Sequence, residues 1–124
     1  MREILFRGKR IGDGTWVEGY FFAKPILEKY FIIDGENQWM VDPKTVGQYT
    51  GKDFKGKRCF GGDIIFTRYS RLLVDWDNDF SAWMTYYFDD NALKRKFCPL
   101  YDIAIWETDG VIGNIHDNPE LMEV

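Results

Sequence analysis

The chain has 124 residues, of which 45% are hydrophobic, 18% aromatic and 29% charged. This length allows one domain, or two very small units that share a core, and excludes a long multi-domain enzyme. The high aromatic content, with charge near the globular average, excludes a wholly disordered chain. The net charge of −4 combines a basic first half, +3 over residues 1–62, with an acidic second half, −7 over residues 63–124. Such halves can attract each other within one chain or between copies, although an ordinary soluble surface can show the same asymmetry.

The two cysteines, Cys59 and Cys98, form no Cys-x-x-Cys motif and stand beside the aromatic residues Phe60 and Phe97. We interpret both as buried free thiols. The charged N-terminus lacks the apolar segment of a signal peptide, and no apolar run approaches the ~18 residues of a membrane-spanning helix. These features predict a protein of the reducing cytoplasm that does not enter a membrane.

Short strands joined by turns are predicted over the first half. The expected strands are Glu3–Arg7, Trp16–Phe22, Tyr30–Asp34 and Gln38–Val41. A Gly-Asp-Gly turn at residues 12–14 predicts an opening hairpin, because glycine supplies the positive φ of tight turns. The alternation that follows places Trp16, Tyr20 and Phe22 on one face of the second strand.

Helix is expected only as single turns. These turns are predicted over residues 43–46, 89–96 and 119–122. The first and the last have an N-cap residue followed by proline, Asp42-Pro43 and Asn118-Pro119. No apolar stripe with the period of a helix extends over ten residues.

The second half continues the β pattern. The expected strands are Ile64–Tyr69, Leu72–Trp76, Trp83–Phe88, Ile103–Glu107 and Val111–Ile115. Short strands separated by Gly-rich turns indicate a mainly β fold, either a small barrel or a sandwich. We predict a single domain over residues 1–124, in which a seam near residues 51–62 separates an N-terminal β layer from a C-terminal barrel.

A charged loop is predicted between Gly51 and Gly56. Four basic residues in and after this loop stand near Phe54 and Phe60, and they are candidate nucleic-acid contacts: Lys52, Lys55, Lys57 and Arg58. A solvated turn has the same composition, and the acidic second half disfavours a polyanion. The spacing also matches a phosphate-binding P-loop, but arginine replaces the metal-binding hydroxyl residue and no helix is expected to follow.

The Asp75-Trp-Asp77-Asn-Asp79 stretch resembles the start of a calcium loop. Phe80 and Tyr86 occupy the places where that loop needs glycine and a bidentate glutamate, so the calcium-loop interpretation fails. A looser metal site stays open beside the favoured interpretation, a hairpin turn built from Asp and Asn. The only histidine, His116, belongs to no recognisable catalytic or metal-binding pattern, and we expect a turn residue. We identify no catalytic constellation, cofactor site or definite metal site.

Three consecutive aromatic residues, Tyr86, Tyr87 and Phe88, must point to both faces of their strand. One face needs a cover, and either a second copy of the chain or the N-terminal half can supply it. Gly62 and Asp63 are predicted to start the strand that follows them. We expect a positive φ at Gly62, and backbone N–H groups bonded to the Asp63 carboxylate.

Three segments of the chain carry a resemblance to a known family. They are Met1–Arg10 with Trp16–Tyr20, Val41–Gly51 leading into Gly62–Ile65, and Val111–Leu121. Within them, Val-Asp-Pro-Lys-Thr-Val-Gly at residues 41–47 and Ile-Gly-Asn-Ile-His-Asp-Asn-Pro-Glu at residues 112–120 are the specific motifs. The sequence resembles the YopX family of small phage and prophage proteins over nearly its whole length. The family usually has a longer loop with an apolar residue after the Thr-Gly, where this chain continues from Gly51 to Lys52. The chain also has Gly61 in place of a frequent Glu and His116 in place of a frequent Tyr.

The resemblance implies a β-rich fold with an SH3-like barrel in the second half, and a phage accessory protein in the cytoplasm of a host bacterium. It implies no catalytic residues. We predict a non-enzymatic binding module that acts on protein, with a second copy of itself and an unknown host or phage protein as partners. The alternatives are a nucleic-acid binder that uses the 52–58 loop, and a small enzyme of the ribonuclease-toxin type.

Overall fold

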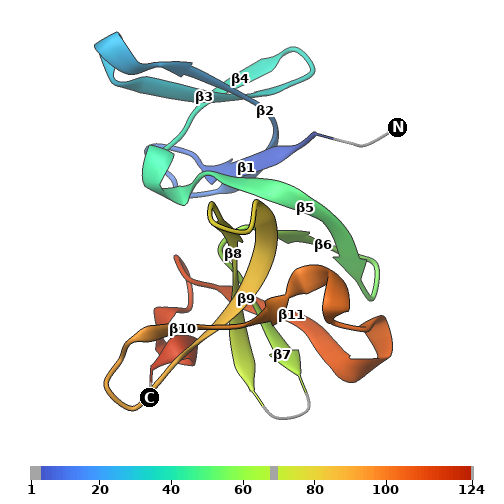
Figure 1. Cartoon of the computed structure of the whole chain (residues 1–124). Helices are drawn as coiled ribbons and strands as arrows, with labels where there is room; N and C mark the ends of the chain where they lie inside the picture. Colours follow the sequence, from blue (N-terminus) through green and yellow to red (C-terminus); the bar gives the residue numbers. More distant parts are fainter. Residues whose placement is uncertain (1–3, 68–69, 124) are drawn as a thin grey trace. The chain divides into compact units, whose positions relative to one another are not determined.

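The computed structural model describes residues 4–67 and 70–123, and within them the fold is built from β-strands and short 3-10 turns (Figure 1). The mainly β fold predicted from the sequence is therefore confirmed. The chain divides into two compact units, unit 1 (Met1–Tyr49) and unit 2 (Thr50–Val124). Their boundary falls just before the seam expected near residues 51–62.

Unit 1 is an antiparallel sheet with the strand order β4-β3-β2-β1-β5. Its elements are β1 (Phe6–Lys9), β2 (Trp16–Lys24), η1 (Pro25–Leu27), β3 (Lys29–Asp34), β4 (Asn37–Met40), η2 (Pro43–Thr45) and the first part of β5 (Gly47–Phe54). The opening hairpin and the turn after Asp42 are confirmed. The Asp42 carboxylate accepts a hydrogen bond from Lys44 N at 3.0 Å, because a capping side chain replaces the missing intrahelical acceptor.

Unit 2 contains a five-stranded antiparallel sheet with the order β10-β9-β8-β7-β11, beside the hairpin of β5 and β6. Its remaining elements are β6 (Lys57–Phe60), β7 (Asp63–Thr67), β8 (Arg71–Asp77), β9 (Ala82–Phe88), β10 (Lys94–Pro99), η3 (Leu100–Asp102), η4 (Ile105–Glu107), β11 (Thr108–Asn114) and η5 (Pro119–Met122). In this order β10 and β11 are the two edge strands of an open sheet. The closed SH3-like barrel implied by the resemblance therefore stays a prediction.

The five-stranded sheet has an apolar cluster on each face, because alternate residues of its strands point in opposite directions. Ile65 pairs with Leu72, and both belong to a core cluster completed by Phe54 of β5, Cys59 of β6 and Leu100 of η3. On the other face, a second cluster joins paired strand residues to η5. Its buried members are Ile64, Leu73, Met84, Tyr86 and Met122. The C-terminal turn therefore covers part of this sheet face.

Three local expectations are wrong. Residues 51–56 are not a loop, because β5 continues to Phe54 and buries that ring before a tight turn. Residues 94–99 form a strand in place of a helical turn; β10 is an edge strand, where charged residues are common. Residues 103–107 contain the 3-10 turn η4 in place of a strand, and β11 begins only at Thr108. The expected strand ends Glu3 and Tyr69 lie outside the described residues.

Candidate functional site

The most exposed apolar sheet face of unit 1 is formed by β2, β3 and β4. In the strand register, Tyr20 pairs with Ile33, and Phe22 pairs with Phe31, which in turn pairs with Met40. Because paired residues of an antiparallel sheet point to the same side, all five side chains share one face. We call these five residues, Tyr20, Phe22, Phe31, Ile33 and Met40, the aromatic face.

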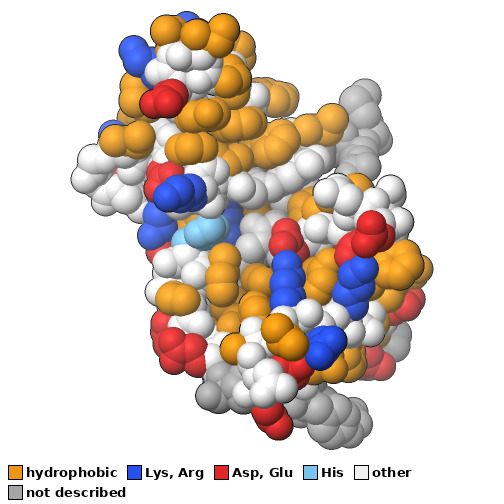
Figure 2. Space-filling view, turned by 60° about the vertical axis from the view of Figure 1, so that its left-hand side comes forward, with side chains coloured by type: hydrophobic (Ala, Val, Ile, Leu, Met, Phe, Trp, Pro, Cys, Tyr) orange, Lys and Arg blue, Asp and Glu red, His pale blue; other side chains and the backbone are white. Residues whose placement is uncertain are grey.

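Exposure distinguishes the aromatic face from a core. Tyr20 is 69% exposed, Phe22 46% and Met40 40%, while Phe31 and Ile33 are half-buried. Two more apolar side chains, Ile26 at 98% and Leu27 at 60%, lie in η1 at the end of the β2–β3 hairpin. Figure 2 shows hydrophobic side chains gathered over the surface of unit 1.

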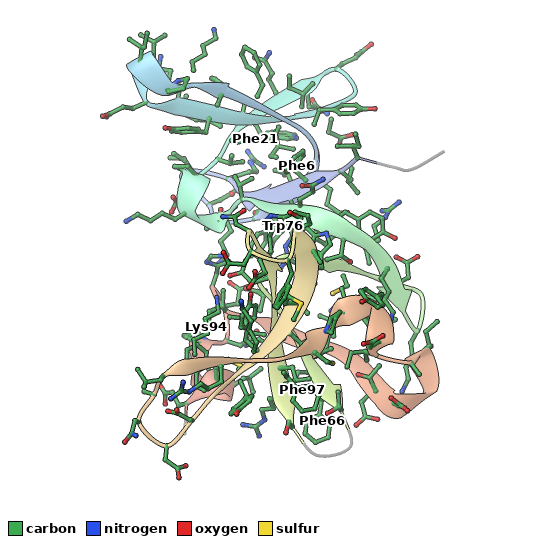
Figure 3. The ribbon with its side chains drawn as sticks, viewed as in Figure 1. Phe6, Phe21, Phe66, Trp76, Lys94 and Phe97 are labelled. Carbon is green, nitrogen blue, oxygen red and sulfur yellow. The ribbon has the colours of Figure 1, made fainter. Side chains whose placement is uncertain are left out.

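The opposite side of the same three strands packs within unit 1. The ring of Phe21 lies 5.7 Å from that of Phe6 and stacks on Tyr30, with centroids 6.3 Å apart and planes within 3° (Figure 3). Ile32 is fully buried on this side. The hairpin therefore has one packed side and one exposed side.

Gly19 lets β2 approach β3 closely at the start of the aromatic face. A Cβ atom at this position would lie 2.2 Å from the backbone oxygen of Ile33 and 2.8 Å from its carbonyl carbon. No side chain fits this space, so glycine is required where β2 leaves β1 for β3. Tyr20, the next residue, starts the exposed face.

The two ends of the aromatic face carry different charges. Lys24 and Lys29 pair across β2 and β3 at one end, and the Lys24 ammonium lies 5.9 Å from the centre of the Phe22 ring. At the other end, the β3–β4 turn carries the exposed Glu36, while Asp34 pairs with Asn37 and, by alternation, belongs to the opposite side of the sheet. Sequence reasoning placed Tyr20 and Phe22 on one face but missed the contribution of β3 and β4; the alternation of residues 29–34 was the signal that could have revealed it.

The candidate interface at residues 86–88 is divided between the two faces of the unit 2 sheet. Tyr86 is buried, Tyr87 is 39% exposed, and Phe88 packs beside the cluster formed with η5. The Tyr86 hydroxyl donates a hydrogen bond of 2.8 Å to the Asp77 carboxylate. Burial, reinforced by this carboxylate, raises the pKa of Tyr86. Of the three aromatic residues, only Tyr87 is exposed to solvent.

The Asp75–Asp79 turn is held by protein groups. Oδ1 of Asp77 accepts hydrogen bonds from the backbone N–H groups of Asp79 and Phe80, while Oδ2 lies 2.8 Å from the Lys96 ammonium. The ammonium of Lys94, a residue labelled in Figure 3, forms a second ion pair, 2.9 Å from Oδ2 of Asp75. The hydrogen bonds from Lys96 and Tyr86 hold the pKa of the Asp77 carboxyl well below its usual value. This arrangement is that of a hairpin turn whose central carboxylate is already neutralised.

The four candidate nucleic-acid contacts have different environments. The Lys52 ammonium donates hydrogen bonds to the backbone oxygens of Leu100, at 2.9 Å, and Ile103, and its burial lowers the pKa. Lys55 lies 4.0 Å from Asp109. Lys57 and Arg58 are exposed on β6. At least one of the four basic residues, Lys52, therefore binds backbone groups of its own chain.

The start of β7 agrees with the sequence prediction. Gly62 has φ +92°, and the Asp63 carboxylate accepts a 2.8 Å hydrogen bond from Phe60 N. The cap expected of Asn118 is wrong, because its Oδ1 accepts from Asn114 N, although Pro119 does begin η5 as predicted.

His116 lies in the turn between β11 and η5, and it is exposed. Its backbone N–H donates to Asn114 Oδ1 at 3.0 Å. A position predicted as a turn residue is thus confirmed as one.

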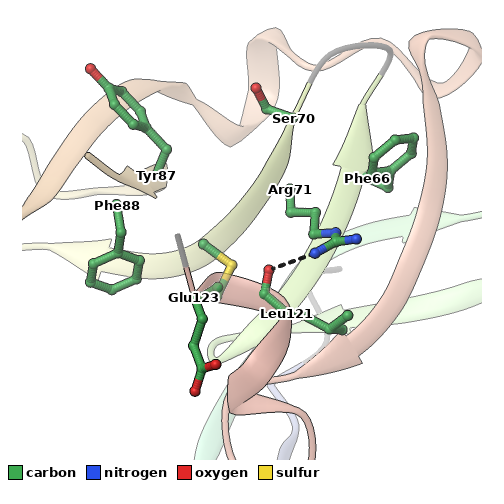
Figure 4. A pocket seen from close by; sticks show the side chains of 8 residues that line it. Phe66, Ser70, Arg71, Tyr87, Phe88, Leu121 and Glu123 are labelled. Carbon is green, nitrogen blue, oxygen red and sulfur yellow. Dashed lines mark hydrogen bonds between the residues drawn. The ribbon is translucent and has the colours of Figure 1, made fainter. Parts of the chain in front are cut away.

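Two shallow concavities border η5 in unit 2. One, of about 440 Å³, is lined by Phe66, Ser70, Arg71, Tyr87, Phe88, Leu121, Met122 and Glu123 (Figure 4). Arg71 reaches across it to the backbone oxygen of Leu121, at 3.4 Å. The second, of about 510 Å³, shares Phe88, Met122 and Glu123 with the first. Apolar surface predominates in the second, whereas polar and apolar surface are nearly balanced in the first. No sequence pattern predicted either concavity.

The comparison with protein families agrees with the resemblance seen in the sequence. A family model described as YopX protein matches residues 13–123, nearly the whole chain. The chain belongs to the YopX family. No curated protein matches it.

In this YopX-family protein, the described residues include no group of three or more His, Cys, Asp or Glu side chains that could hold a metal ion. Residues 4–67 and 70–123 also contain no helix that is long and apolar enough to cross a membrane. The five members of the aromatic face present apolar side chains and one phenol hydroxyl, that of Tyr20.

Proposed function

We propose that this YopX-family protein is a non-enzymatic phage or prophage accessory protein that binds protein in the cytoplasm of its bacterial host. The observation that supports this function is the exposure of the aromatic face. Contiguous apolar surface on a small protein is typical of a protein interaction site, because its burial is worth about 25 cal/mol per Å². Aromatic side chains contribute most to such contacts.

The shape and chemistry of the face favour a protein partner. Its members lie on a regular sheet, where they present an even apolar surface instead of an enclosed pocket for a small molecule. The contacts of Lys52 with the η3 backbone make the 52–58 segment a weaker polyanion site than its sequence suggests. We therefore do not put forward nucleic acid as the partner.

Affinity capture from an extract of bacteria that express the protein tests this function. The immobilised baits are the unaltered chain, Tyr20→Glu on the aromatic face, and Tyr101→Glu as a matched control. Tyr101 is 74% exposed in η3, so the control makes the same change at an equally exposed tyrosine. We expect a protein that is retained by the unaltered chain and by Tyr101→Glu, but lost with Tyr20→Glu. Identical retention by all three baits contradicts the proposal.

A further inference from the structure

We infer that the partner of the aromatic face is a second copy of the same chain, packed face to face in a two-fold dimer. The two-fold axis lies in the interface and runs across the strands, so that the strands of the two copies are antiparallel. This inference rests on the proposed function, because it names the protein that the face binds.

The charges at the ends of the face are self-complementary. Lys24 and Lys29 mark one end, and Glu36 in the β3–β4 turn marks the other, beyond the ~17 Å that β3 spans from Lys29 to Asp34 at ~3.4 Å per residue. Even with Glu28 beside it, the lysine end keeps a charge of +1 against −1 from Glu36 at the turn. An axis across the strands places the lysine end of each copy against the acidic end of the other. An axis along the strands would bring like charges together.

The pairing of Lys24 with Lys29 supports the same arrangement from within one chain. Like charges directly opposite each other on neighbouring strands destabilise a sheet. Glu36, brought by a second copy, would relieve this repulsion at each end of the interface. The complementary ends therefore favour a second copy over an unrelated apolar partner.

The size of the face is sufficient for a dimer. With Ile26 and Leu27 at its end, the exposed apolar side chains provide roughly 600 Å² if a whole aromatic side chain contributes about 200 Å². A standard interface buries about 800 Å² on each partner, and the charged ends supply the remainder. Residues 1–49 carry 7 Lys and Arg and 7 Asp and Glu, so two copies of unit 1 do not repel each other.

Sedimentation of the full chain at micromolar concentrations gives the first test. We expect a dimer with about twice the monomer mass of 14.7 kDa, which Tyr20→Glu dissociates and Tyr101→Glu leaves intact. A chain that remains monomeric at every concentration overturns the inference, as does a dimer that survives Tyr20→Glu.

Charge exchange gives the second test, which does not depend on a mutated apolar residue. One variant carries Lys24→Glu and Lys29→Glu, and the other carries Glu36→Lys. Each variant alone should be monomeric, because both of its end contacts become repulsive. An equimolar mixture should form a heterodimer, since both end contacts are then attractive. Circular dichroism confirms that each variant is folded, and a mixture that stays monomeric overturns the antiparallel arrangement.

The two proposals can fail separately. The chain could be monomeric while a bacterial protein is captured by the unaltered chain and not by Tyr20→Glu. In that case the aromatic face binds a different protein, which supports the proposed function and contradicts the dimer. If neither dimerisation nor capture depends on Tyr20, both proposals fail.

Discussion

The Lys96 ammonium lies 2.8 Å from Oδ2 of Asp77, the same carboxylate oxygen that accepts the Tyr86 hydroxyl. Asp77 stands at the end of β8, Tyr86 on β9 and Lys96 on β10, so one side chain joins three adjacent strands. Its other oxygen orders the turn through Asp79 N and Phe80 N. A buried carboxylate with this many donors is a structural centre of unit 2.

Asp77→Ala should lower the melting temperature by several degrees. The substitution removes four hydrogen-bond acceptor contacts and leaves the buried Tyr86 hydroxyl and the Lys96 ammonium without their carboxylate. The matched control is Asp79→Ala, since Asp79 is 89% exposed and 3.7 Å from the same ammonium. Thermal denaturation followed by circular dichroism compares the two; equal effects would show that Asp77 has no special role.

Stability should fall in acid through Asp77. Its folded-state pKa lies below the unfolded value of about 4, so the carboxylate stabilises the fold above that pH and loses the contribution as the pH falls toward the folded pKa. The Asp77→Asn variant has no carboxyl group at this position, so its stability lacks this pH-dependent contribution. Urea denaturation from pH 7 down to pH 2 should therefore show a difference between wild type and variant that shrinks below pH 4. A difference that is constant with pH contradicts the assignment.

Lys52→Met should destabilise unit 2 by about 1–3 kcal/mol, because two backbone oxygens, those of Leu100 and Ile103, lose a charged donor. Methionine keeps the length and apolar stem of the side chain. Lys57→Met is the control, since Lys57 is exposed in the same hairpin. Chemical denaturation measures both, and an equal small effect at the two positions would refute the structural role of Lys52.

Gly62→Val should destabilise the fold by about 1–3 kcal/mol, because a β-branched residue is strained at φ +92°. Space is not the cause: a Cβ atom here would lie 3.6 Å from His116 Nε2 and 3.7 Å from Ile115, which is ordinary contact. The double variant Gly62→Val/His116→Ala separates the two explanations. The double variant should lower the free energy of unfolding by the sum of the two single effects. If His116→Ala instead restored the stability lost in Gly62→Val, crowding against His116 would be the cause.

Gly19→Ala should cost roughly 3 kcal/mol or more, since the new methyl group meets the backbone of Ile33 and β2 must separate from β3. Hydrogen exchange is the suitable measurement. The amides of β2 and β3 should lose protection, while those of β7 and β8 keep theirs. Retained protection in the β2–β3 hairpin would mean that the strands accommodate a side chain at this point.

Local patterns were sufficient to predict much of the fold. The alternation of residues 16–22 identified one strand, and the apolar and aromatic runs at 72–76 and 83–88, on either side of an Asp-Asn-Asp turn, identified two more. Asp42 before Pro43 identified a helical turn. The positive φ of Gly62 followed from its place in a turn. Each of these features depends on contacts between residues close in sequence, where propensity and turn chemistry act directly.

The same local rules failed where distant residues decide the conformation. Residues 103–107 are apolar enough for a strand, but they include the 3-10 turn η4, and the backbone oxygen of Ile103 accepts a hydrogen bond from the Lys52 side chain, 51 residues away along the chain. Residues 94–99 begin with three charged residues and were not recognised as a strand, but they pair with β9 and form the edge of its sheet.

The sequence by itself determined that the protein is mainly β, belongs to the YopX pattern and has more aromatic side chains than a small core needs. Only the tertiary structure decided which aromatic residues are covered. Phe21 and Tyr30 pack inside unit 1, while Tyr20 and Phe22, one residue away along β2, remain exposed. Alternation along a strand defines two faces, but which face is buried depends on the strands and turns that the rest of the chain brings against it.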